Sequence, residues 1–152
     1  SCFVGEIKGP MVFFNDYKDP KQKINKKIYT KVLEDNLVPF IAAARSLVGS
    51  NLIFQHDNAP LHKVTKWLDK KKINYMTWPA RSPDLNPIEN LWKVVKDDIQ
   101  NRENFPRDAD ELKIAIKEAW SNLDVSVLRA LVESVQQRIE EVASGDGRSS
   151  KY

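Results

Sequence analysis

The sequence has very little cysteine and no long apolar segment. Cys2 is the only cysteine, which excludes an intramolecular disulfide and a cysteine-rich zinc site. No apolar run approaches the roughly 20 residues that a membrane-spanning helix needs, and no signal-peptide pattern opens the chain. We therefore expect an intracellular protein with no membrane partner.

The sequence also lacks the marks of a module that reads DNA sequence. It contains no helix-turn-helix or zinc-finger pattern, and aromatic residues do not alternate with its basic stretches. The composition is ordinary for one globular domain, with 41% hydrophobic and 30% charged residues. Sequence-specific recognition of DNA is not expected from this chain.

Positive charge is concentrated in the first half of the chain. Residues 1–72 carry 13 Lys and Arg against 7 Asp and Glu, whereas residues 73–152 carry 11 against 14. Basic side chains such as Lys63 and Lys66 can neutralise DNA phosphates, and Arg81 in a polar loop is the best single candidate for a DNA contact. The alternative for each lysine is a solvated helix face.

The pattern of apolar residues predicts an α/β architecture over residues 1–143. A strand hairpin is expected within residues 1–16, formed by Phe3–Ile7 and Met11–Asn15 with its turn at Gly9-Pro10. A helix is expected over residues 22–48, and a strand over residues 51–57. Pro39 should kink or break that helix.

The second half of the chain is predicted to be mainly helical. Pro60 to Lys72 should form a helix, Tyr75-Met76 a short strand, and residues 86–143 a set of helices. Residues 144–152 have the composition of a flexible tail. Each predicted helix carries an apolar stripe that is expected to face the core, and the last stripe comprises Leu128, Leu131, Val132, Val135 and Ile139.

Two acidic residues stand out by their positions. Asp57 follows the apolar segment Leu52-Ile53-Phe54, at the end of a predicted strand, and Glu89 lies at the start of a predicted helix. Magnesium prefers oxygen ligands and keeps several waters, so a phosphoryl-transfer site supplies only a few carboxylates. Two such ions about 3.5–4 Å apart can activate the attacking oxygen and stabilise the leaving oxygen. The pair indicates a divalent-metal site.

Each acidic residue also has a purely structural alternative. Asn86-Pro87-Ile88-Glu89 has the spacing of a capping box, in which Glu89 would bond back to the start of its own helix. Asp57 could form an Asx-type turn. His56 should face away from Asp57 on a strand. His62 either orients a ligand or is a hydrogen-bonded structural residue, and both alternatives remain open.

Taken together, these motifs resemble those of a known family. The quoted motifs are His56-Asp57-Asn58-Ala59-Pro60-x-His62, then Trp78-Pro79, then Ser82-Pro83-Asp84-Leu85-Asn86-Pro87-Ile88-Glu89-Asn90-Leu91-Trp92. They resemble the signature of mariner-superfamily transposases of the Tc branch, which are DDE/D enzymes. The resemblance covers most of the chain, more loosely beyond about Asn101.

The resemblance implies an RNase H-like fold (the DDE transposase/integrase fold) with a helical C-terminal part. By position, Asp57 corresponds to the second acidic residue of the triad and Glu89 to the third. Both would bind metal, as Mg2+ or Mn2+, with two ions in the complete site. The residues expected to support them are Asn58, His62, Asp84 and Asn86.

Two departures from the family pattern affect the expected activity. The family's first Asp lies on the first strand of the domain, and neither Asp16 nor Asp19 is a plausible substitute. The fold is therefore expected to lack its first strand here, and the chain by itself to be inactive. In addition, 31 residues separate Asp57 from Glu89, which is about one helical turn fewer than the family pattern.

The resemblance predicts metal-dependent DNA strand cleavage and strand transfer in the complete protein, with transposon ends and target DNA as partners. The alternative is a non-catalytic or domesticated remnant that binds DNA or protein. An unpaired hairpin edge favours a homodimer or a partner that completes the sheet. The implied location is the nucleus in a eukaryotic host and the cytoplasm otherwise.

Overall fold

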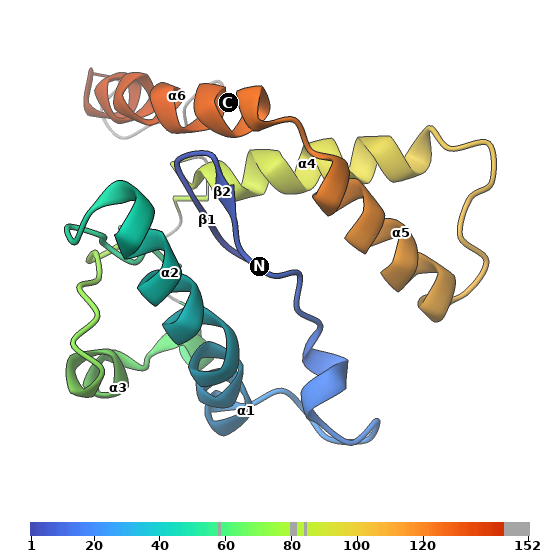
Figure 1. The fold of residues 1–152 in the computed structure, drawn as a ribbon, viewed down its shortest axis with the longest axis horizontal. Coiled ribbons are helices and arrows are strands. Elements are labelled where there is room, and N and C mark those ends of the chain that lie inside the picture. Colours follow the sequence, from blue (N-terminus) through green and yellow to red (C-terminus); the bar gives the residue numbers. More distant parts are fainter. Residues whose placement is uncertain (58, 80–81, 84, 145–152) are drawn as a thin grey trace. The chain divides into compact units, whose positions relative to one another are not determined.

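A computed structural model of the chain describes residues 1–57, 59–79, 82–83 and 85–144. The chain divides into two compact units. The first comprises Ser1–Val4 and Lys8–Arg81, and the second comprises Gly5–Ile7 and Ser82–Tyr152. Figure 1 shows the elements of both units. Within the described ranges, no helix is both long and apolar enough to cross a membrane.

The chain begins with a small hairpin, in which β1 (Phe3–Val4) pairs with β2 (Ile7–Lys8). Gly5 in the turn has a φ of 53°, a conformation that glycine adopts without strain. The turn predicted at Gly9-Pro10 is therefore wrong. Gly9 instead approaches Cys2, to whose carbonyl its N–H donates at 2.8 Å, and a Cβ there would meet the Cys2 Sγ atom at 2.6 Å.

The second predicted strand, Met11–Asn15, is also absent. Residues 11–13 have no regular structure, and the 3-10 helix η1 (Phe14–Tyr17) follows. This helix packs against α1 (Lys26–Val32), where Phe14 contacts the Tyr29 ring with a centroid distance of 6.3 Å. Phe14, one of the apolar residues that suggested a strand, packs against the core of the first unit instead.

The long helical segment continues past Pro39. After α1 comes one π-helical turn, η2 (Leu33–Leu37), and then α2 (Val38–Val48), with Asn25 capping the start through a 3.1 Å bond from the Ile28 N–H. Proline has no N–H and its ring crowds the preceding turn. The wider π turn directly before Pro39, closed by the Val38 N–H on the Leu33 carbonyl, lets the helix continue.

The core of the first unit lies on one face of this helical segment. Leu33, Leu37 and Ile41 recur at helical spacing and are buried, as the sequence predicted, and Tyr29 is buried with them although it was not part of the predicted stripe. They pack with residues from the following segments, namely Val64, Leu68 and Ile73. Leu68, on α3 (Thr65–Lys70), is completely buried.

The strand expected over residues 51–57 is reduced to one isolated parallel bridge between Phe54 and Tyr75. The Phe54 N–H donates to the Asn74 carbonyl at 2.7 Å, and the Met76 N–H donates to the Phe54 carbonyl at 3.0 Å. A strand needs a longer ladder to be regular, and the described residues supply no further partner here. The described part of the chain is therefore mostly helical.

The helix predicted from Pro60 to Lys72 is interrupted. Residues Pro60–His62 form the 3-10 helix η3, Lys63 and Val64 leave helical geometry, and α3 starts at Thr65. The break allows Val64, only 1% exposed, to join the core. It also separates His62 from α3.

The second unit contains α4 (Pro87–Gln100), α5 (Ala109–Asn122) and α6 (Val125–Ser144). Helix α4 packs against both α5 and α6 (Figure 1). Leu91 and Leu128 are fully buried, and Trp92 stacks on Trp120 with a centroid distance of 5.7 Å. The predicted stripe on α6 is only partly buried, since Val132 and Ile139 are exposed. The tail residues 145–152 lie outside the described residues.

Candidate functional site

Asp57 lies just beyond the bridge that fixes Phe54, in a segment without regular structure. Its side chain is 55% exposed. The Oδ1 atom accepts a hydrogen bond from the Ala59 N–H at 3.0 Å, which is an Asx-type turn. The same oxygen contacts Nδ1 of His62. Because an ionised carboxylate only accepts, Nδ1 is the donor.

These contacts determine the ionisation of Asp57. Partial burial favours the neutral acid, but the Ala59 N–H, the hydrogen bond from His62 and the charges of His62 and His56 outweigh it and hold the pKa of Asp57 below its ordinary value. The carboxylate is therefore ionised at neutral pH. Its orientation is set by two donors that lie two and five residues further along the chain.

His62 is itself held in place by Tyr29. The two rings stack with a centroid distance of 4.4 Å and an angle of 30°. Tyr29 is 6% exposed on α1, and burial of its ring, followed by the nearby charges of Asp57 and Cys2, raises the pKa of its hydroxyl. The ring therefore stays neutral and apolar. Tyr29 was not selected from the sequence, where its only signal is its spacing of four and eight residues from Leu33 and Leu37.

His56 does not face away from Asp57 as predicted. Its ring stacks on Phe54 at 5.0 Å and lies 5.7 Å from the ring of His62, which contacts Asp57. The prediction failed because residues 55–57 do not form a strand, so side chains do not alternate there. Burial, and then the charge of His62, lower the pKa of His56, and among the described residues its Nδ1 atom is buried without a partner.

Glu89 occupies the first turn of α4. The Asn86 side chain caps this helix by accepting from the Ile88 N–H at 3.3 Å, and Pro87 follows at the first helical position. The capping-box alternative required Glu89 to accept from the Asn86 N–H, which instead donates to the Pro83 carbonyl at 2.9 Å. Among the described residues the Glu89 carboxylate is exposed and has no hydrogen-bond or ion-pair partner.

The remaining predicted site residues are Lys63, Lys66, Asn58, Arg81 and Asp84. Lys63 follows η3 and Lys66 lies on α3, and both side chains are exposed. Asn58, Arg81 and Asp84 lie outside the described residues. Asp57 belongs to the first unit and Glu89 to the second. Over the described ranges, no three His, Cys, Asp or Glu side chains gather closely enough to hold a metal ion.

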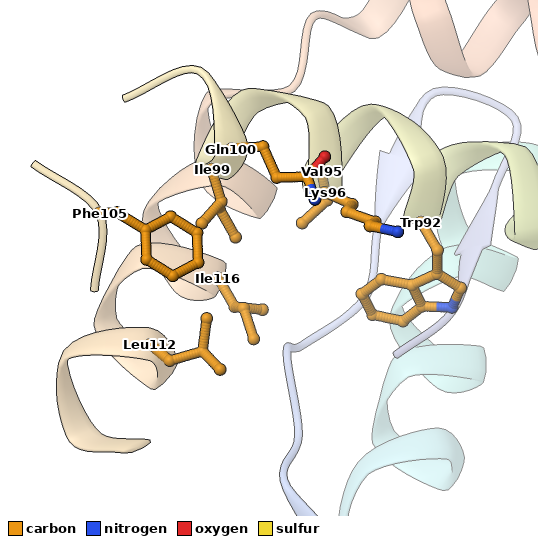
Figure 2. Close-up of a pocket in the computed structure, with 8 residues that line it drawn as sticks. All are labelled: Trp92, Val95, Lys96, Ile99, Gln100, Phe105, Leu112 and Ile116. Carbon is orange, nitrogen blue, oxygen red and sulfur yellow. The ribbon is translucent and has the colours of Figure 1, made fainter. Parts of the chain in front are cut away.

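The second unit also contains an apolar groove between α4 and α5, with a volume of about 290 Å3. Figure 2 shows the side chains that line it. They are Trp92, Val95, Lys96, Ile99, Gln100, Phe105, Leu112 and Ile116. Neither Asp57 nor Glu89 lines this groove.

The fold is that of a known class of catalytic domain. The solved catalytic domain of Mos1 mariner transposase matches with a TM-score of 0.73 at 21% identity, covering 88% of this chain and 67% of that chain. The Mos1 catalytic domain with Raltegravir and Mn matches with a TM-score of 0.74 at 22% identity, covering 88% of this chain and 68% of that chain. This match defines an RNase H-like fold.

Sequence comparison identifies the family. Residues 17–113 match the family described as DDE superfamily endonuclease. The Tc3 transposase of Caenorhabditis elegans is 37% identical over 134 residues, covering 86% of this chain and 40% of the relative. The Tcb1 transposase of Caenorhabditis briggsae is 30% identical over 154 residues, covering 99% of this chain and 52% of the relative.

The chain therefore belongs to the DDE superfamily of endonucleases, and over most of its length it is a homologue of the Tc1/mariner transposase catalytic domain. It spans about half the length, or less, of the relatives given above. The resemblance noted from the sequence motifs is confirmed.

Proposed function

We propose that this chain is part of the catalytic machinery of a DNA transposase, which cuts a DNA strand with water and joins the freed 3′-hydroxyl to a phosphate of target DNA. Homology to transposases supports the reaction class. One observation supports placing the reaction at particular residues. The Asp57 carboxylate is ionised, and the Ala59 N–H and His62 orient it.

The donor set suits a hard divalent cation. The contacts of Asp57 use Oδ1, and among the described residues no donor contacts Oδ2. Glu89 offers an exposed carboxylate at a helix start. Mos1 catalytic domains have been solved with Mn and with Mg. We propose that Asp57 and Glu89 hold two Mg2+ or Mn2+ ions, which would activate the attacking oxygen and stabilise the leaving one.

A third carboxylate is needed for the complete site. Among the described residues, no group of three His, Cys, Asp or Glu side chains could hold a metal ion, so the described part of the chain does not supply the complete set. We propose that the third ligand comes from an upstream strand, as in the family pattern, and that residues 1–152 alone do not cleave DNA. A strand supplied upstream, by a second copy or by a partner would complete both the sheet and the site.

DNA is the proposed partner. Two related solved structures are described as a Mos1 mariner paired end complex with Mn and a Mos1 strand transfer complex. In this chain Lys63 and Lys66 are exposed next to the segment that holds Asp57 and His62. We propose that they contact DNA phosphates, a type of contact that weakens as salt concentration rises.

The test is Mg2+- or Mn2+-dependent cleavage of a DNA duplex by residues 1–152 and by the chain extended upstream through the strand with the first Asp. We expect cleavage only by the extended chain. Asp57→Asn and Glu89→Gln should each abolish it without unfolding the protein. Asp97→Asn, an exposed carboxylate on the same helix as Glu89, is the matched control and should cleave normally.

Wild-type cleavage by Asp57→Asn or Glu89→Gln would contradict the assignment. Inactivity of the extended wild-type chain, with DNA binding retained, would instead support the alternative of a remnant that binds DNA without cutting it.

A further inference from the structure

Arg138, on α6, is the largest fully buried side chain among the described residues. It is 1% exposed, and in the described part of the chain no other polar or charged residue is buried to this degree. Removing a guanidinium from water is costly unless its N–H groups are satisfied. The groups that it contacts therefore indicate what the buried charge is for.

One of its N–H groups bonds within α6 and another connects α6 to α4. The Nε–H donates to the Ser134 Oγ atom at 3.0 Å, one turn earlier on α6. The Nη1–H donates to the Asn90 Oδ1 atom at 3.2 Å, in the first turns of α4. Helices α4 and α6 lie side by side in the second unit (Figure 1). Because the guanidinium is planar and its donors point in fixed directions, it ties α4 to α6 at a defined angle.

Asn90 directly follows Glu89. Successive helical side chains are rotated by about 100° around the axis, so anchoring Asn90 also fixes the direction in which Glu89 projects. On the other side of Asn90, Leu91 is completely buried. The first turn of α4 is thus held by one polar and one apolar contact, while the Glu89 side chain stays exposed.

We propose that Arg138 is a positioning residue for Glu89, acting through Asn90. The inference rests on the proposed function, in which Glu89 is a metal ligand. It assigns a role in the site to α6, which lies beyond the residues 17–113 that match the endonuclease family. Groups that orient metal ligands typically change metal affinity about 10- to 100-fold when mutated.

The test compares Arg138→Met with Arg129→Met. Arg129 lies on the same helix but is exposed and paired with Glu6, so it is a matched control. In the upstream-extended chain, R138M should raise the Mg2+ concentration for half-maximal cleavage by about 10- to 100-fold. DNA affinity measured without metal should change less than about twofold, and R129M should change neither quantity. If Arg138 had a purely structural role, R138M would change the Mg2+ dependence and the DNA affinity together.

A second readout does not depend on activity. In residues 1–152, the NMR signals of the Asn90 side-chain amide and the Glu89 backbone amide should shift in R138M and stay unchanged in R129M. Arg138→Lys keeps the charge but not the planar fork, so it should fail to restore the wild-type signals. If R138M does not fold, R138M combined with Asn90→Leu replaces it, because the pair removes both partners of the bond between α6 and α4, and the Glu89 backbone amide is then the NMR readout.

The outcomes separate the two proposals. If Glu89→Gln retains wild-type cleavage, the proposed function fails, and the inference about Arg138 fails with it. If Glu89→Gln is inactive while folded R138M keeps wild-type Mg2+ dependence and unchanged Asn90 signals, only the inference about Arg138 is overturned.

Discussion

Nδ1 of His62 contacts Oδ1 of Asp57, five residues earlier in the chain. The contact depends on η3, the short 3-10 helix that turns the chain back after Ala59, and on Tyr29, whose ring stacks on the ring of His62. His62 thereby acts both as a hydrogen-bonded structural residue and as a group that orients Asp57.

Removing the His62 donor should raise the pKa of Asp57 toward its ordinary value near 3.8. A carboxylate with a lowered pKa contributes stability above its ordinary pKa, and this contribution is lost as pH falls through the lowered value. The free energy of unfolding should therefore fall more between pH 5 and pH 3 in the wild type than in His62→Phe, which keeps a ring against Tyr29.

The measurement is urea unfolding at both pH values, with an NMR titration of the Asp57 carboxyl carbon. The difference in lost unfolding free energy between the wild type and His62→Phe should be small, because the Asp57 side chain is 55% exposed. Asp57→Asn is the control, since it should show neither the titration nor the extra loss of stability. An unchanged Asp57 pKa in His62→Phe would contradict this account of the site.

His56 should make the protein less stable in mild acid. Because burial lowers its pKa from the ordinary 6.5, the unfolded chain binds a proton more readily than the folded chain. The free energy of unfolding should thus decrease as pH falls below 6.5 toward the lowered value, and His56→Phe should lack this decrease.

At neutral pH, His56→Phe removes a buried Nδ1 atom that has no partner among the described residues. We expect its free energy of unfolding to equal that of the wild type or to be up to about 1 kcal/mol higher. Urea unfolding of the wild type and His56→Phe at pH 7.5 and 5.5 tests both the stability expected at neutral pH and the loss expected in mild acid. Parallel loss of stability in wild type and variant would show that His56 is not the group responsible.

Leu128 and Val132 give a matched pair of truncations on α6. Leu128 is completely buried, so Leu128→Ala removes packed methyl groups and should cost about 2–5 kcal/mol of unfolding free energy. Val132 is 42% exposed, and Val132→Ala should cost no more than about 0.5 kcal/mol. Urea unfolding followed by circular dichroism gives both values. Equal costs would contradict the burial of Leu128 and the exposure of Val132.

The start of α5 depends on Asp108. Its Oδ1 atom accepts from the N–H groups of Asp110 and Glu111, both at 2.9 Å. Asp108→Ala should cost about 1 kcal/mol of unfolding free energy, whereas Asp108→Asn keeps an acceptor and should cost little. Thermal and urea unfolding measure the stability of both variants. If the two variants lost stability equally, the Asp108 cap would be excluded as the cause of the loss.

The sequence predicted well those features that depend on neighbouring residues. The apolar spacing of Leu33, Leu37 and Ile41 placed them correctly in a core, because a helix brings residues three and four apart onto one face. Asn86 and Pro87 marked the start of α4 for a similarly local reason. The motifs around Asp57 and Glu89 were enough to identify the family, although not to show how the two residues are arranged.

Local rules failed where the partner of a segment decides its structure. Met11–Asn15 and residues 51–57 have apolar patterns typical of strands, but a strand requires another strand to pair with, and the described residues offer only the bridge from Phe54 to Tyr75. Likewise, the apolar stripe on α6 could not show that Leu128 is buried while Ile139 is exposed.

By itself, the sequence determined the start of α4, the core face of the first long helix and, through its motifs, the family. The first two follow from contacts within a few residues. Only the tertiary structure decided that Tyr29 supports His62, that His56 lies beside it, and that Arg138 reaches Asn90. These contacts join residues up to 48 positions apart. Their formation depends on how helices pack, and no local pattern of residues encodes it.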